Sequence, residues 1–233
     1  MSKQRCFSTA LILRDLVPAE AWEELTRFPG RHHLAGETLL RQGDSGTHVL
    51  AILRGMVKVV RTDADGKERL LAFRGPGEVL GEMAVQVDGA RLASVRAISE
   101  CEVSVVPAEA FRRFVTQHDL ANQLAAHAVS RLREQTQTCE GDVDRRLAAA
   151  LLRLIAVSGV RSFSLTREEL GQHIGVSRCS ITKVLERFGE QRVQAGRLYI
   201  EVIDEQYLHH VLARDTTRRV GHDALIGRPG PRS

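Results

Sequence analysis

The feature that most constrains the fold is a change of hydrophobic period near Pro107. Between Arg31 and Val106, short apolar runs alternate with glycine-containing turns, and Asp65-Gly66 separates two alternating segments. An Asp-Gly pair in this position is a strong signal for a β-hairpin. Many short strands at this spacing predict a closed or sandwiched all-β domain. After Pro107 the apolar residues recur at helical spacing, so we expect helices to follow the β domain.

A long helix is predicted after Asp119, with small residues along one face. Positions at heptad spacing are Ala121, Ala125, Ala128, Leu132, Gln135 and Cys139. Such a seam suits close pairing of two helices, and Leu124 is assigned to the same dimer interface. The alternative is a helix that packs on its own domain. His127, also on this helix, is expected to be solvated.

Two short helices near the C-terminal end carry the clearest functional signal. The segment 166–169 forms a capping box, with Thr166 as the N-cap and Glu169 three residues later. Gly175 permits a sharp turn and Ser177 can cap a second helix. The core of a helix-turn-helix is then formed by Leu170, Ile174, Val176, Ile181 and Val184. Ala195-Gly196-Arg197 between two short strands predicts a wing beside it.

The second helix of this pair leaves basic and polar side chains outside the core. Residues 161–200 contain seven Arg or Lys against four Asp or Glu. A helix of this kind fits the major groove, where Arg can bind guanine O6 and N7. The residues expected to contact DNA are Thr166, Gln172, Ser177, Arg178, Cys179, Ser180, Thr182, Lys183, Arg187 and Arg197. The alternatives are an ordinary helical hairpin with a solvated basic face and, at Cys179, a redox switch.

Composition and spacing exclude several classes of protein. The 33 Lys and Arg against 29 Asp and Glu give a net charge of +4, which permits a nucleic-acid partner without requiring one. The longest apolar run, 147–160, contains Arg153 and is too short to span a bilayer, so we expect a cytoplasmic protein without membrane contact. The four cysteines lack CxxC spacing, and no metal site is expected.

Catalysis is not expected either. The chain has no nucleophile elbow, Walker loop or HExxH motif, so no catalytic residues are assigned. The glycines at 75, 77 and 81 lack the spacing of a dinucleotide-binding fingerprint, and no helix is expected after them.

The order of a glycine-punctuated β domain, a heptad helix and a winged helix resembles the Crp/Fnr family of bacterial transcription regulators. The resemblance covers about residues 13 to 205. Residues 77–84 (GEVLGEMA) and 89–97 (GARLASVRA) look like the phosphate-binding cassette of cyclic-nucleotide-binding domains. Residues 170–178 (LGQHIGVSR) are similar to the family's helix-turn-helix pattern.

This resemblance implies an α+β protein with an N-terminal β jelly-roll, a dimerisation helix and a C-terminal winged helix-turn-helix. We expect an effector domain at 13–116, a dimerisation helix at 117–143 and a DNA-binding domain at 144–205. A short helix and a disordered tail are expected at 206–233. The implied function is a homodimeric, effector-controlled regulator that binds inverted-repeat double-stranded DNA, with RNA polymerase as a further candidate partner. The alternatives are effector-independent DNA binding and a ligand-binding regulatory module that acts on a protein partner.

The resemblance also implies an effector site. In cyclic-nucleotide-binding members a glutamate holds the ribose hydroxyl and an arginine pairs with the cyclic phosphate, and Glu82 and Arg91 match these positions. The full expected site is Gly81, Glu82, Met83, Ala84, Arg91, Leu92, Gln135 and Thr136. Cyclic-AMP members carry Ser or Thr at the position of Leu92, so one hydroxyl donor to the phosphate is missing here.

No cofactor is certain from these residues. We expect a cyclic nucleotide or another anionic small effector, with cyclic AMP bound weakly or not at all. The alternative is that Arg91 pairs with Glu82 and holds an empty barrel closed.

Overall fold

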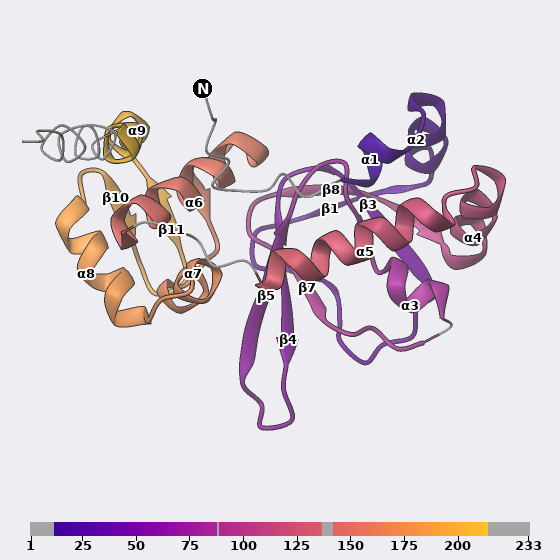
Figure 1. Ribbon diagram of the computed structural model, residues 1–233, viewed down its shortest axis with the longest axis horizontal. Helices are drawn as coiled ribbons and strands as arrows, with labels where there is room; N and C mark the ends of the chain where they lie inside the picture. The colour runs from indigo at the N-terminus through magenta and orange to yellow at the C-terminus, as the bar shows by residue number, and fades with distance from the viewer. Residues whose placement is uncertain (1–11, 88, 137–141, 214–233) are drawn as a thin grey trace, which may run out of the picture.

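The computed structural model describes residues 12–87, 89–136 and 142–213, with only the backbone described for Ser130 and for residues 132–136. Two short helices, α1 (Leu13–Leu16) and α2 (Ala19–Thr26), precede a β sandwich (Figure 1). Pro18 stands at the N-cap of α2 with a φ of −55°, which suits the start of a helix.

Two antiparallel four-stranded sheets form the sandwich. The first has the order β1-β8-β3-β6, with bounds Gly30–His33, Cys101–Pro107, His48–Arg54 and Val79–Leu80. The second has the order β2-β7-β4-β5, with bounds Thr38–Leu40, Ser94–Ala97, Val57–Thr62 and Glu68–Arg74. Apolar residues from both sheets, including Leu50, Ile52, Val57, Val95 and Val103, pack into one cluster between them. The predicted all-β domain is confirmed.

The predicted hairpin joins β4 to β5. Gly66 has a φ of 80°, and its N–H donates to the carbonyl of Asp63 at 2.9 Å. This left-handed conformation is one that glycine adopts without strain. The hairpin extends away from the rest of the β domain in Figure 1, and β5 is the edge strand of its sheet.

A short helix that the sequence reasoning did not expect, α3 (Glu82–Gln86), begins directly after Gly81. Gly81 has a φ of 86° and caps this helix. The five-residue helix is too short to show a hydrophobic period in the sequence. Its consequence is that Glu82 is placed in the first turn of a helix and is buried.

Two further helices follow the sandwich. Helix α4 (Ala108–Gln117) buries Phe111 and Phe114, and α5 (Ala121–Thr136) runs along the side of the β domain in Figure 1. Between them, Asp119 has a φ of 49°. Residues 137–141, which include the heptad position Cys139, lie outside the described residues.

The C-terminal region combines a helical core with a small sheet. It comprises α6 (Val143–Ser158), β9 (Ser162–Phe163), α7 (Arg167–Ile174), α8 (Arg178–Phe188), β10 (Val193–Ala195), β11 (Ile200–Val202) and α9 (Glu205–Ala213). The sheet order is β10-β11-β9, and the β10–β11 hairpin is the predicted wing. The expected tail beyond residue 213 lies outside the described residues.

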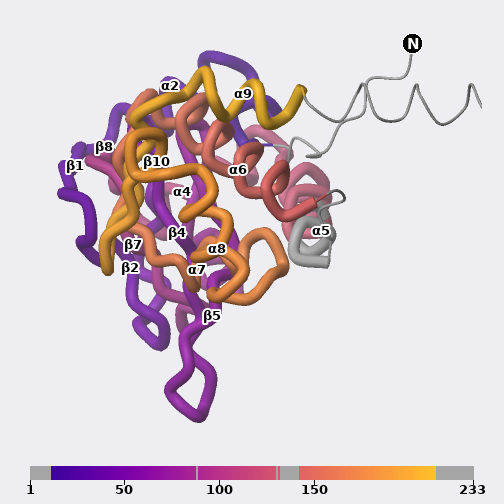
Figure 2. The backbone as a smooth tube through the Cα atoms, turned by 90° about the vertical axis from the view of Figure 1, so that its left-hand side faces the viewer, coloured from indigo at the N-terminus to yellow at the C-terminus, as the bar shows by residue number. Residues whose placement is uncertain are grey.

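The C-terminal region packs on the β domain. One apolar cluster joins Met56, Val60, Leu70 and Phe73 of the β domain to the core of the C-terminal helices. In Figure 2, α7 lies beside β5, in agreement with the contacts between these two elements. Among the described residues, no helix has the length and apolar character needed to cross a membrane.

Candidate DNA-binding and effector-binding sites

Local hydrogen bonds define the start of α7. The Thr166 hydroxyl accepts the N–H of Glu169 at 3.1 Å, and a carboxylate oxygen of Glu169 accepts the N–H of Thr166 at 2.8 Å. This reciprocal pair is the predicted capping box, and it satisfies donors that the first turn of a helix leaves open.

The turn between α7 and α8 depends on glycine. Gly175 ends α7 with a φ of 70°, and a Cβ on Gly171 would lie 2.7 Å from the carbonyl oxygen of Val176. Ser177 then caps α8 by accepting the N–H of Ser180 at 3.1 Å. The turn holds the two helices close together, and Leu170, Ile174, Ile181 and Val184 are all buried between them as predicted.

The outer face of α8 is polar and basic. Ser177, Arg178, Cys179 and Lys183 are exposed, and Ser180 and Thr182 are half-buried. Arg187 is also exposed, but its guanidinium is paired with the Asp144 carboxylate of α6. This hydrogen bond raises the pKa of Arg187, and the guanidinium charge is engaged in an ion pair with Asp144. Arg178 and Lys183 make no such ion pair among the described residues.

The wing is anchored by a residue that sequence reasoning did not assign. The Arg167 guanidinium donates to the carbonyls of Ala195 at 2.5 Å and Gly196 at 3.1 Å. Arg197 at the tip is exposed, as are its neighbours Leu198 and Tyr199. The position of Arg167 in the first turn of α7 was visible in the sequence, but its partners were not, because they belong to a later hairpin.

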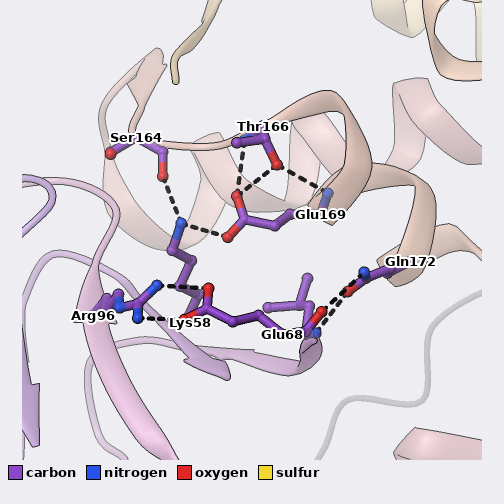
Figure 3. Close-up of polar contacts among 8 residues, drawn as sticks. Lys58, Glu68, Arg96, Ser164, Thr166, Glu169 and Gln172 are labelled. Carbon is purple, nitrogen blue, oxygen red and sulfur yellow. Dashed lines mark hydrogen bonds and ion pairs between the residues drawn. The ribbon is translucent and has the colours of Figure 1, made fainter. Parts of the chain in front are cut away.

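Thr166 and Gln172 occupy a different environment from the other predicted DNA contacts. Both are half-buried, and the Gln172 side chain is hydrogen-bonded to the backbone of β5. Figure 3 shows this contact beside the ion pair between Lys58 and Glu169. In this structure the Gln172 amide is therefore bonded to β5, and the Thr166 hydroxyl is used in the capping box.

The phosphate-cassette arginine is buried. Arg91 is 4% exposed and donates to the carbonyls of Gly81 at 2.9 Å and His48 at 2.5 Å. A Cβ on Gly81 would lie 1.9 Å from Nη1 of Arg91, so only glycine lets the guanidinium approach here. Burial lowers the pKa of Arg91, while the charges of Glu82 and Asp44 act in the opposite direction. The expected alternative of a direct Arg91–Glu82 pair is replaced by these carbonyl contacts.

Glu82 is bonded instead to an arginine from α5. Arg131 donates to Glu82 Oε1 at 2.6 Å and to Glu78 Oε2 at 2.8 Å. His127 Nε2 lies 3.1 Å from the same oxygen of Glu78. His127 is only 2% exposed, so the expectation that it is solvated is wrong. Its carboxylate partner lies 49 residues away in the chain, which sequence spacing could not reveal.

Glu78 is the centre of this buried cluster. Burial alone would raise the pKa of Glu78, but the hydrogen bond from His127 and the charges of Arg131 and Arg74 lower it to about 2. The carboxylate is therefore ionised at neutral pH, and it ties α5 to the β domain through Arg131 and His127. We name Glu78, Glu82, His127 and Arg131 the α5 anchor.

The remaining predicted effector residues are distributed around the cassette. Ala84 is buried, whereas Met83 is 43% exposed and Leu92 is 66% exposed. Gln135 and Thr136 lie in the last turn of α5, and their side chains lie outside the described part of the structure. The exposed Leu92 presents an apolar surface beside Arg91 in the chain.

The predicted dimer seam of α5 is partly exposed, so part of it is free to contact a second helix. Ala121 and Ala125 are exposed and Ala128 is half-buried, on the same helix that carries His127 and Arg131. Leu124 packs against the apolar cluster of its own domain, which includes Phe111 and Leu120. The side chains of Leu132 and Gln135 lie outside the described part. Within the ranges that are described, no three His, Cys, Asp or Glu side chains are grouped as metal ligands.

Two family models match the chain in the order of these sites. Residues 30–118 match the cyclic nucleotide-binding domain, and residues 145–211 match the Crp-like helix-turn-helix domain. The first match contains the cassette with Arg91, and the second contains the capping box, the turn and α8.

Curated relatives agree with both matches. A cyclic AMP receptor protein from Thermus thermophilus is 31% identical over 206 residues, which cover 86% of this chain and 95% of that protein. The cAMP-activated global transcriptional regulator CRP of Escherichia coli O157:H7 is 29% identical over 168 residues, covering 67% of this chain and 80% of the regulator.

Solved structures show the same fold. A CRP/FNR-family transcriptional regulator from Thermus thermophilus has a TM-score of 0.54 at 23% identity, covering 79% of this chain and 98% of that one. A c-di-GMP responsive global regulator from Xanthomonas campestris has a TM-score of 0.56 at 20% identity, covering 79% and 99%. With the β sandwich, the cassette and the winged helix in place, the chain belongs to the Crp/Fnr family of transcription regulators.

Proposed function

We propose that the protein binds an inverted-repeat operator as a homodimer, with α8 of each copy in a major groove. The observation that carries this proposal is the structure of α8, which is capped by Ser177, buried on its apolar face and basic on its outer face at Arg178 and Lys183. Recognition helices of this motif contact base edges with residues near their N-terminus, where Arg178 and Cys179 lie. Ser177, Ser180, Thr182, Arg187 and Arg197 complete the proposed contacts.

A selection from random double-stranded DNA tests this proposal. We expect an inverted repeat whose half-sites are about one helical turn apart, because two copies related by a two-fold axis present two recognition helices. Recovery of single half-sites only would contradict dimeric binding, and recovery of no common sequence would contradict specific recognition.

The seam of α5 is proposed as the dimer interface. Ala121 and Ala125 are exposed, and small residues permit two helices to approach closely. Replacing Leu132, which follows Ala128 in the same heptad series, by glutamate places a charge in that seam. Sedimentation of Leu132→Glu is expected to show monomers at micromolar concentration, and a mutant that remains dimeric would place the interface elsewhere.

The cassette is proposed to bind an anionic small effector. Arg91 is buried, and its hydrogen bonds go to neutral carbonyls, while Glu82 is paired with Arg131. A buried guanidinium is stabilised by a negative charge. An anion beside Arg91 would supply that negative charge, which the neutral carbonyls lack. The curated relatives are named for cyclic AMP and one structural relative for c-di-GMP, and both ligands carry phosphodiester anions.

Leu92 argues against tight binding of cyclic AMP. A hydroxyl donor that the phosphate loses is worth about 1–3 kcal/mol, which is roughly tenfold to a hundredfold in affinity. Calorimetry with cyclic AMP and with c-di-GMP, on the unmodified protein and on Leu92→Ser, separates the outcomes. Tight cyclic-AMP binding by the unmodified protein would contradict the argument from Leu92. Binding of neither ligand by either protein would favour regulation without these effectors.

The division of the chain is part of the same proposal. We assign effector binding to 13–116, dimerisation to 117–143 and DNA binding to 144–205. RNA polymerase is the proposed further partner of the DNA-bound dimer, since transcription regulators act on this enzyme at promoters. Pull-down of the polymerase by the operator complex, compared with operator DNA alone, tests that contact.

A further inference from the structure

The free edge of β5 is covered by a side chain from the DNA-binding region. Oε1 of Gln172 accepts the N–H of Leu70 at 2.7 Å, and Nε2 of Gln172 donates to the carbonyl of Glu68 at 3.4 Å (Figure 3). A group that bonds the carbonyl of one residue and the N–H two residues later copies the pattern of a parallel strand. The Gln172 amide therefore takes the place of a neighbouring strand on an edge that would otherwise be open.

An ion pair secures the same contact. Lys58 of β4 is 8% exposed, and its Nζ lies 2.5 Å from Glu169 Oε1 and 3.4 Å from the carbonyl of Ser164. The Glu169 side chain is 14% exposed, so both charges are largely removed from water. Removing one partner of such a pair leaves an uncompensated charge, which strongly destabilises the arrangement that buries it.

The polar contacts surround an apolar interface. The rings of Phe73 and His173 meet edge to face with centroids 4.5 Å apart. Burial, together with the charges of Arg153 and Arg74, lowers the pKa of His173 to about 4, so this ring is neutral at neutral pH. We name the set of Lys58, Leu70 and Phe73 with Glu169, Gln172 and His173 the hairpin–α7 contact.

We propose that the hairpin–α7 contact and DNA compete for α7, so that the docked arrangement described here has low affinity for DNA. Lys58 is the residue that holds the DNA-binding region in this docked arrangement. In helix-turn-helix proteins the first helix of the motif crosses the DNA backbone, and α7 is that helix here. Its expected DNA contact Gln172 is committed to β5 while the hairpin is docked. This inference rests on the proposed DNA-binding face and adds a control to it.

The variant Lys58→Met tests the competition. Methionine keeps the apolar length of the side chain but leaves the Glu169 charge unpaired in the docked arrangement, so docking becomes unfavourable. We expect about tenfold tighter binding of the selected operator, measured by fluorescence anisotropy without added effector, as about 1.4 kcal/mol is tenfold. If Lys58 acted only through its positive charge, Lys58→Met would instead weaken operator binding, because losing a cation weakens binding to a polyanion.

A matched control and a rescue sharpen the result. Lys67→Met removes the same charge from the exposed end of the same hairpin and is expected to leave the affinity unchanged or slightly lower. Adding Glu169→Gln to Lys58→Met removes the unpaired carboxylate while a glutamine can still serve the capping box. The double variant is therefore expected to return toward the affinity of the unmodified protein.

Hydrogen exchange reports whether the contact has opened. The Leu70 amide, bonded to Gln172, should exchange faster in Lys58→Met than in Lys67→Met. Faster exchange with unchanged or weaker operator binding would overturn the proposal, as would unchanged exchange with unchanged affinity. If Lys58→Met does not fold, Lys58→Gln tests the same charge with a smaller change in polarity. Failure of the unmodified protein to bind any operator would instead contradict the proposed function.

Discussion

The cations of the two binding regions differ in what surrounds them. Around the cassette, Arg91 is buried and the Arg131 side chain is 13% exposed, and the two are bonded to protein carbonyls and carboxylates. On α8, Arg178 and Lys183 are exposed to water. Exposed cations can meet the phosphates and base edges of DNA with little rearrangement, whereas a ligand at the cassette must work within a network that the fold has already built. We therefore expect the same residue type to contribute to stability in one region and to DNA recognition in the other.

The largest effect is expected from Arg131→Met. This change leaves Glu82 without its α5 partner and leaves Glu78 with only His127 of its two α5 partners, and breaking a buried pair costs about 3–5 kcal/mol. Urea unfolding should show that loss. The exposed Arg113 on α4 provides the control, since Arg113→Met is expected to change stability by less than about 0.5 kcal/mol. Equal effects of the two variants would show that the α5 anchor does not stabilise the protein.

Acid should weaken the same anchor. The pKa of Glu78 is lowered from 4.5 to about 2 in the folded protein, so its contribution is fully present above pH 4.5 and is lost as the pH falls toward 2. The expected loss in unfolding free energy is about 3 kcal/mol over that window. Glu78→Gln should be less stable at neutral pH and show a flatter dependence between pH 4.5 and 2. A parallel dependence in both proteins would assign the acid sensitivity to other carboxylates.

Substitutions on the outer face of α8 should change DNA binding rather than stability. Arg178→Ala removes an exposed cation near the start of α8, and we expect a loss of about 1–3 kcal/mol that is concentrated at one base pair of each half-site. Stability should change little because Arg178 is not buried. Binding assays with single substitutions in the operator measure the specificity. A uniform loss across all operator variants would make Arg178 a phosphate contact.

The smallest effect is expected from Arg187→Ala. The Arg187 guanidinium is already paired with Asp144, so it offers less free charge to DNA than Lys183 does. We expect a loss in operator affinity of under about 1 kcal/mol, smaller than for Lys183→Ala. The dependence of affinity on salt concentration measures both variants. A larger decrease in salt slope for Arg187→Ala than for Lys183→Ala would show that the Asp144 pair opens on DNA.

Features that depend on neighbours in the chain were predicted well. The capping box of Thr166 and Glu169, the turn at Gly175 and the hairpin at Gly66 each depend on residues a few positions apart. The periods of 2 and 3.6 likewise assigned the β domain and the helices. The short helix after Gly81 was missed because five residues carry too little periodic signal.

By itself, the sequence determined the order of a β sandwich, a long helix and a winged helix-turn-helix, because local hydrogen bonding and hydrophobic period are written in adjacent residues. Only the tertiary structure decided that His127 is buried against Glu78, that Arg131 holds Glu82, and that Gln172 covers the edge of β5. These partners lie far apart in the chain. Their pairing depends on where sheets and helices pack, since the burial of a charge is a property of the surrounding fold and not of its neighbours in sequence.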